Sequence, residues 1–184
     1  MAKPFVEIRF DQRNTKLLEI YDNIYNEIIS YEGSISFQNY KFNNYIGDIT
    51  KNIKWTWAIN KASNELFNIR EINEQINHLF DNDFTIIGAS FITLYENQVT
   101  DTDFHLDINT HYDKPETTNT LTVIFPLYIE DDMGGLEYKY KDLIKIYKYK
   151  KNRAFIWDGC KLEHRTQPYI LNERKKRVLV SINY

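Results

Sequence analysis

Apolar residues recur at two different spacings along the chain, and the change falls near residue 84. Before that point, two stretches place an apolar residue every three or four positions, which is typical of a helix with one face in a core. The first follows Asn14, a residue type that often caps helices, and ends near Gly33. Its apolar positions are Leu17, Ile20, Tyr21, Ile24, Tyr25 and Ile28. We therefore predict a core-facing helix between Asn14 and Gly33.

A second helix is predicted to begin at Ser63, another capping residue type, and to end at the polar run 81–83. Its apolar positions are Leu66, Phe67, Ile69, Ile72, Ile76 and Leu79. Residues 5–10 and 55–59 are rich in aromatic and β-branched side chains, which favours strands. Residues 34–54 are polar and rich in Asn and Tyr, and they predict no particular element.

From residue 84 onward, short apolar runs alternate with turn residues, which predicts many short strands. Helices followed by such strands indicate the α+β class, mainly β, with a double-stranded β-helix core of the jelly-roll or cupin type. In this fold we expect the two N-terminal helices to pack on one sheet. No repeat or linker divides the chain, so we predict a single domain, 1–184, with supporting strands and helices in 1–83 and the jelly-roll core in 84–184.

The composition, 42% hydrophobic and 15% aromatic residues, is that of a globular protein. A single cysteine, Cys160, excludes an internal disulfide framework and favours a reducing compartment. No apolar run has membrane length, and the N-terminal residues do not resemble a signal peptide. We therefore expect a soluble, intracellular (cytoplasmic) protein without a membrane partner, of unknown oligomeric state.

The net charge of −3 hides a basic segment, residues 139–177, with 13 Lys or Arg against 4 Asp or Glu. Such a segment can bind nucleic acid or an acidic substrate. The alternative, which we favour, is that its lysines form the solvent side of amphipathic strands, because tyrosines alternate with them. These lysines are Lys139, Lys141, Lys145, Lys148 and Lys150.

Candidate chemistry begins at His105 and Asp107, which are two positions apart. In an extended chain both side chains leave the same face, so one metal ion can contact an imidazole and a carboxylate together. His164, after the apolar run 155–157, is the candidate third ligand. Two His and one carboxylate on one side of a metal leave open positions, an arrangement associated with non-heme Fe(II) oxygenases. Arg177 opens the last predicted strand, where a guanidinium could bind a carboxylate through two hydrogen bonds.

Residues 91–184 resemble the 2-oxoglutarate/Fe(II)-dependent dioxygenases, closest to the prolyl-4-hydroxylase-like branch. The resemblance rests on five stretches of the chain: 93–96 followed by His105 and Asp107, 127–137 with its acidic turn and Gly-Gly, 151–157, 164–168, and 177–183. The branch often has Lys where this chain has Arg177. The spacing from His164 to Arg177 is slightly long, so Arg174 is a rival for the same role.

The resemblance implies that His105, Asp107 and His164 bind Fe(II), and that Arg177 and Tyr95 hold the distal carboxylate of 2-oxoglutarate. It also implies O2 as a cosubstrate, ascorbate as a candidate reductant, and release of succinate and CO2. Because Asp107 keeps the carboxylate that halogenating relatives lack, we expect hydroxylation of an aliphatic C–H bond. The expected substrate is an amino acid, another small molecule or a peptide.

Two alternative functions and one possible extension of the metal site remain. A non-catalytic metal- or carbohydrate-binding jelly roll explains the strands but gives no reason for Arg177 behind His164. A nucleic-acid demethylase would fit the basic segment. However, this chain lacks the second arginine of that family, because Ser181 and Asn183 occupy the matching positions, and we therefore expect no nucleic-acid partner. His111 and Asp113 could extend the metal site, although we expect a loop there. We assign no role to Cys160, and we expect His78 to be partly exposed on its helix.

Overall fold

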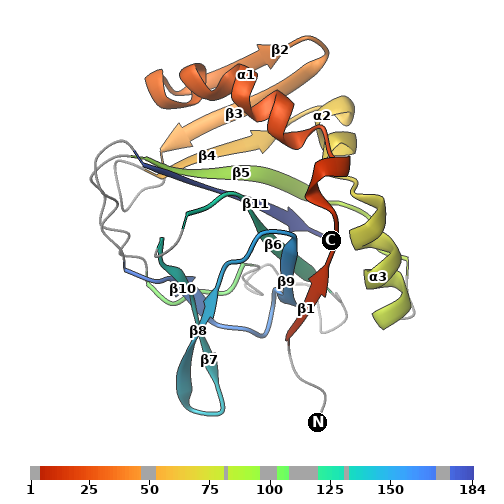
Figure 1. Cartoon of the computed structure of the whole chain (residues 1–184), viewed down its shortest axis with the longest axis vertical. Coiled ribbons are helices and arrows are strands. Elements are labelled where there is room, and N and C mark those ends of the chain that lie inside the picture. Colours follow the sequence, from red (N-terminus) through yellow and green to blue (C-terminus); the bar gives the residue numbers. More distant parts are fainter. Residues whose placement is uncertain are drawn as a thin grey trace, which may run out of the picture.

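A computed structural model describes residues 5–46, 53–80, 83–95, 103–107, 120–130, 133–168 and 175–184. Its main feature is a sheet of eight antiparallel strands, in the order β1-β9-β6-β11-β5-β4-β3-β2 (Figure 1). In chain order the bounds are β1 Phe5–Arg9, β2 Gly33–Phe37, β3 Tyr40–Ile46, β4 Ile53–Ala58, β5 Gly88–Tyr95, β6 Leu121–Tyr128, β9 Arg153–Asp158 and β11 Lys176–Asn183. Strands from both halves of the sequence therefore share one sheet.

A smaller sheet has the order β10-β7-β8, with β7 at Gly135–Tyr140, β8 at Leu143–Lys148 and β10 at His164–Thr166. The β7–β8 hairpin extends from the lower part of the molecule in Figure 1. The described strands thus form two sheets of unequal size. This arrangement agrees with the predicted mainly β fold.

Three α-helices are present among the described residues: α1 Leu17–Ser30, α2 Lys61–Leu66 and α3 Arg70–Phe80. The expectation of two N-terminal helices is therefore wrong, because the predicted second helix is broken at residues 67–69. Asn60, not Ser63, caps α2: its side-chain oxygen accepts a hydrogen bond from the Ser63 backbone. The first helix starts at Leu17, after a short 3-10 turn at Gln12–Asn14.

The central strands of the large sheet are buried on both faces, and alternate residues of these strands enter different cores. In β6, Val123 and Phe125 pack with the residues of α1, whereas Ile124 packs on the opposite face with residues of the small sheet. In β9, Ile156 likewise packs on the helix side, and Trp157 packs on the side of the small sheet. One face therefore belongs to the helices, and the other faces the small sheet and the site described below.

Other sequence expectations have mixed outcomes. Strand β1 matches the strand predicted at 5–10, and β4 matches the strand at 55–59 except for small shifts at its ends. The lysines predicted to lie on the solvent side of β7, β8 and the following turn are exposed: Lys139, Lys141, Lys145, Lys148 and Lys150. Leu79, predicted to face the core, is 49% exposed at the end of α3. None of the helices in the described part of the chain has the length and apolar character needed to cross a bilayer.

Steric constraints explain the two glycines at the start of β7. Gly134 has a φ of 67°, a conformation that most other residues adopt only at a cost. Gly135 pairs with Lys148 of β8, and a Cβ at this position would overlap the carbonyl oxygen of Tyr147. The pair therefore allows β8 to lie close to β7, which fixes the position of the residues that follow β8.

Candidate functional site

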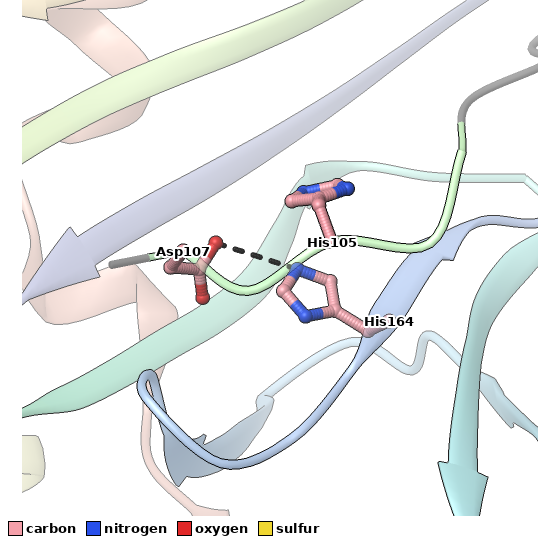
Figure 2. Close-up of side chains that lie close together, drawn as sticks. All are labelled: His105, Asp107 and His164. Atoms are coloured by element: carbon pink, nitrogen blue, oxygen red, sulfur yellow. Dashed lines mark ion pairs between the residues drawn. The ribbon is translucent and has the colours of Figure 1, made fainter. Parts of the chain in front are cut away.

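His105, Asp107 and His164 lie together, as the sequence predicted, and the backbone explains how. His105 and His164 form an isolated antiparallel bridge, in which each backbone N–H donates to the other residue's carbonyl over 2.9 and 3.0 Å. This bridge holds the segment 103–107 beside β10. One side-chain ligand atom from each of the three residues lies within 4.8 Å of the others. Figure 2 shows the two imidazoles and the carboxylate facing a common space.

Both imidazoles are oriented through the same ring nitrogen. His105 Nδ1 lies 2.9 Å from the carbonyl oxygen of Asp103, and His164 Nδ1 lies 3.0 Å from that of Leu162. A carbonyl only accepts hydrogen bonds, so both Nδ1 atoms carry the proton. Nε2 of each ring is left to bind a metal, which is the usual way in which outer partners fix histidine ligands.

Hydrogen bonds also fix the orientation of the Asp107 carboxylate. Its Oδ2 accepts hydrogen bonds from Thr122 Oγ1 at 2.7 Å and from Trp157 Nε1 at 3.0 Å. Its Oδ1 lies 3.3 Å from His164 Nε2, the contact drawn as a dashed line in Figure 2. The backbone of residue 107 is open to solvent, but the side chain is only 21% exposed. One carboxylate oxygen is thus held by Thr122 and Trp157, and the other faces Nε2 of His164.

The charges in this cluster favour a cation. Burial raises the pKa of Asp107, but hydrogen bonds from His164 and Thr122 and the charges of both imidazoles outweigh burial, so its pKa lies below the usual range. Burial lowers the pKa of His164, while the hydrogen bond and the charge of Asp107 raise it by more, so its pKa lies above the usual range. A divalent metal ion would replace the proton that Asp107 stabilises on His164. Two imidazole nitrogens and a carboxylate oxygen fit iron in its ferrous state.

The three residues line a cavity of about 360 Å³ that also contains Arg177. Asp107 is bonded to Thr122, which pairs with Asn183, six residues further along β11 than Arg177. The Asp107 carboxylate and the Arg177 side chain therefore line the cavity near opposite ends of β11. The walls between them are largely apolar and include Ile53, Trp55, Ile92, Leu94, Ile124, Leu136, Trp157 and Leu179.

Arg177 is buried, with 2% exposure, and its Nη1 donates to the carbonyl of Met133 at 2.8 Å. It pairs with Leu94 of β5, and both side chains line the cavity. The preceding residue, Lys176, points to the helix side and lies over the rings of Tyr25 and Tyr128. Arg174, the rival for the same role, lies outside the described residues.

The expected role of Tyr95 does not agree with its position. In β5, Thr93 and Tyr95 are two positions apart, so their side chains leave the same face of the sheet. This face is turned toward the helices, because the Thr93 side chain lies 2.9 Å from the hydroxyl of Tyr21 in α1. The Tyr95 hydroxyl donates to the carbonyl of Ile29 in α1, at 3.5 Å. The residues of β5 that line the cavity are Ile92 and Leu94. Tyr95 is therefore not among the residues that line the cavity with Arg177.

The cavity contains a tyrosine that sequence reasoning missed. Tyr149 follows β8 directly, is buried, and lines the same cavity as the metal cluster. The guanidinium carbon of Arg177 lies 5.7 Å from the centre of its ring. The sequence shows Tyr147 and Tyr149 alternating with lysines, but this pattern alone does not indicate which tyrosine reaches the site.

Two other polar candidates, His78 and Cys160, lie outside this cluster. His78 is exposed on α3, as expected. His111 and Asp113 lie outside the described residues, so the expectation that they belong to a loop rather than to the metal site stays a prediction. Cys160 is partly buried, with its sulfur 3.0 Å from Thr120 Oγ1. Among the residues described, His105, Asp107 and His164 are the group whose side-chain atoms lie close enough together to hold a metal ion.

No protein-family model and no curated protein matches this sequence. Solved structures do match over almost the whole chain. The viral collagen prolyl hydroxylase of Paramecium Bursaria Chlorella virus-1, solved with 2-oxoglutarate, is 14% identical with a TM-score of 0.57, over 99% of this chain and 96% of its own. The prolyl hydroxylase of Trichoplax adhaerens, solved with a hypoxia-inducible-factor peptide, is 14% identical with a TM-score of 0.62, over 100% and 84%.

A third similar structure is the non-heme α-ketoglutarate-dependent carbocyclase SnoK from nogalamycin biosynthesis. It is 12% identical with a TM-score of 0.65, over 99% of this chain and 79% of its own. Two of these solved structures are prolyl hydroxylases, the third depends on α-ketoglutarate, and a 2-oxoglutarate/Fe(II) oxygenase from Burkholderia pseudomallei matches at 11% identity with a TM-score of 0.60. The chain therefore has the fold of 2-oxoglutarate/Fe(II) oxygenases, in agreement with the resemblance seen in its sequence.

The contact between Trp157 and Asp107 gives a first prediction. Replacing Trp157 with phenylalanine removes the donor to Asp107 Oδ2 but keeps an aromatic ring in place. We expect Fe(II) or Mn(II) to bind about 10- to 100-fold more weakly, as is typical when a partner of a metal ligand is lost. Calorimetric metal titration of the purified protein measures this change. The matched control is Trp57→Phe, whose indole lies outside the cavity lining; an equal loss in both variants would contradict the role of Trp157.

Proposed function

We propose that this protein is an Fe(II)- and 2-oxoglutarate-dependent dioxygenase. One observation carries the proposal: two imidazole nitrogens and one carboxylate oxygen come together in the same largely apolar cavity that contains a buried arginine. The cluster alone would suit many metal proteins. A buried cation in the same cavity is what a cosubstrate with a second, distal carboxylate requires. The fold shared with solved 2-oxoglutarate oxygenases supports the same conclusion.

Each residue has a defined part in this proposal. His105, Asp107 and His164 hold the iron, and the backbone carbonyls behind both imidazoles keep Nε2 turned toward it. Arg177 binds the distal carboxylate of 2-oxoglutarate. When bound, iron and 2-oxoglutarate supply the oxidising power that inserts one oxygen atom of O2 into a C–H bond, with succinate and CO2 as the other products. The apolar walls exclude water from the space between the two ends.

For the substrate, we propose an aliphatic C–H bond in an amino acid, another small molecule or a peptide. His105 and the neighbouring Asp103 are exposed and line the cavity, so the metal cluster can be reached from solvent. The neighbours include a collagen prolyl hydroxylase, a complex with a peptide fragment and a carbocyclase, so this fold accommodates peptide as well as small-molecule chemistry.

The test is an anaerobic titration of the purified protein, first with Fe(II) and then with 2-oxoglutarate. Chelation of iron by a 2-oxo acid gives a visible charge-transfer band, which we expect in the wild-type protein. It should be absent in a His105→Ala variant that remains folded by circular dichroism. Folded wild-type protein that binds Fe(II) without forming the band contradicts the proposal and favours a non-catalytic metal-binding module.

A further inference from the structure

Phe104 lies one position before the proposed metal ligand His105, but on the other face of the chain. The odd-numbered side chains of the segment 103–107 line the cavity. In an extended segment, the Phe104 side chain therefore leaves the opposite face. The antiparallel bridge between His105 and His164 places Phe104 opposite Arg165 of β10. Phe104 thus connects the segment to the face of the small sheet that is turned away from the cavity.

Two cations lie over the Phe104 ring. The guanidinium carbon of Arg165 is 4.6 Å from the ring centre, and Nζ of Lys139, in β7, is 4.8 Å from it. Both distances are within the range of a cation–π contact, in which the electron-rich face of the ring attracts a positive charge. The Phe104 ring is therefore attached to two strands of the small sheet at once.

Each cation is held in place by a carboxylate of the small sheet. Arg165 Nε donates to Glu137 Oε2 at 2.7 Å, and the Glu137 side chain is only 13% exposed. Lys139 Nζ lies 2.6 Å from Glu163 Oε2. The strand pairing supports both contacts, because Arg165 pairs with Glu137 and the Lys139 backbone N–H donates to the Glu163 carbonyl. The small sheet itself therefore sets the positions of the two charges on which Phe104 rests.

The segment 103–107 has few other attachments in the part of the chain that the structure describes. There, its backbone bonds to β10 only through His105, which takes part in two hydrogen bonds. The Asp107 side chain bonds to residues of β6 and β9, at the other end of the segment. With so few bonds, two cation–π contacts are a substantial part of what holds His105 beside β10.

We propose that Phe104 is a positioning residue: the two cations under its ring hold the segment 103–107 against the small sheet, and so place His105 for metal binding before a metal arrives. Only the docked form of the segment brings His105 to His164. The apparent metal affinity therefore falls in proportion to the docked fraction. The inference rests on the proposed function for its metal ion, and not on the cosubstrate.

The experiment compares the wild type with Phe104→Leu, which keeps an apolar side chain and removes the aromatic face. In the metal-free proteins, NMR hydrogen exchange of the His105 amide, which donates to the His164 carbonyl, measures undocking of the segment. Loss of two cation–π contacts should speed this exchange roughly 5- to 30-fold. Amides in β11 should exchange as in the wild type, because the effect is local.

Calorimetric titration of the same proteins with Mn(II) measures the consequence for the metal site. We expect Phe104→Leu to bind Mn(II) at least about threefold more weakly than the wild type, because a smaller fraction of the protein is docked. Phe104→Tyr, which keeps an aromatic face, should resemble the wild type in both exchange and Mn(II) affinity.

Two further variants separate the cation contacts from the bulk of the side chain. Arg165→Met removes one cation, and in a double-mutant cycle with Phe104→Leu the two losses of Mn(II) affinity should be less than multiplicative. The cost of leaving Glu137 unpaired is present in both Arg165 variants and cancels in the cycle. The matched control is Tyr140→Leu, because Tyr140 also lies under two lysines, but in the β7–β8 hairpin. Its His105 exchange and its Mn(II) affinity should equal those of the wild type.

The outcomes separate the two proposals. Unchanged His105 exchange or unchanged Mn(II) affinity in folded Phe104→Leu overturns the inference while the proposed function stands. Equally faster exchange in β11 would show a general loss of stability, and fully multiplicative losses in the cycle would show that ring and guanidinium act independently; either result also overturns it. If the folded wild type binds neither Mn(II) nor Fe(II), the proposed function fails, and the role of Phe104 in metal binding fails with it.

Discussion

Replacing His105 with alanine should lower 2-oxoglutarate turnover by more than about 100-fold, because losing a ligand should exceed the 10- to 100-fold effect of losing a ligand's hydrogen-bond partner. His105 is exposed, and the bridge that holds its segment uses backbone atoms only. The variant should therefore fold normally. Succinate release in the presence of a turned-over substrate, or uncoupled release without one, measures the activity.

A matched histidine is available as the control for this experiment. His78 is also exposed, but it lies on α3, and it is not part of the metal-binding group. His78→Ala should keep wild-type activity and wild-type Fe(II) affinity. Full activity in His105→Ala, with the protein folded and iron present, would show that His105 is not a metal ligand. It would also contradict the sequence resemblance at its first proposed ligand.

The second large effect is expected from Arg177→Met, which keeps the length of the side chain and removes its charge. Two hydrogen bonds to a carboxylate, each with a net contribution of about 1.5 kcal/mol or more, correspond to at least a ~100-fold loss of 2-oxoglutarate affinity. Arg177→Lys should lose less, because an ammonium keeps the charge but not the planar fork. The anaerobic charge-transfer titration gives both dissociation constants.

Lys176→Met provides the control on the adjacent residue. Lys176 lies on the opposite face of β11, over tyrosine rings, so its loss can alter stability but should leave 2-oxoglutarate affinity unchanged. Circular dichroism melting separates the two effects. If Lys176→Met and Arg177→Met weaken 2-oxoglutarate equally, the effect comes from distortion of β11, and Arg177 is not the carboxylate anchor.

The metal cluster was predictable because its residues are few, polar and placed at fixed spacings. His105 and Asp107 share one short segment, and His164 follows an apolar strand, so the sequence alone indicated three candidate ligands that the structure places together. The bridge between His105 and His164 was not predictable, since it joins residues far apart in the chain.

Tyr95 and Tyr149 show why the sequence does not reveal which tyrosine lines the cavity. Strand β5 is buried on both faces, so its apolar pattern does not reveal which face lines the cavity. Period-two alternation tells which residues share a face, not what that face contacts. The hydroxyl contact of Tyr95 with Ile29 and the placement of Tyr149 beside Arg177 both depend on tertiary packing.

Residues 34–54 illustrate a second limit. Their polar composition predicted no element, yet β2, β3 and the start of β4 lie there. Asn44 explains part of this result: it is buried in β3, where its amide nitrogen donates to the carbonyls of Ile28 and Tyr31 and its oxygen accepts from Thr56. A polar residue whose hydrogen bonds are satisfied by distant partners is indistinguishable, in sequence, from a surface residue.

The consecutive cations of β11 link the chemistry of this protein to the alignment of one strand. Lys176 and Arg177 face opposite sides of the same sheet, and β11 pairs with β5 on one side and β6 on the other. A slip of one residue would turn Lys176 into the cavity and Arg177 toward the helices. Insertions or deletions between β10 and β11 are therefore tolerated only when they leave this strand pairing unchanged. A sequence alignment that is wrong by one residue here would assign the proposed cosubstrate contact to the wrong side chain.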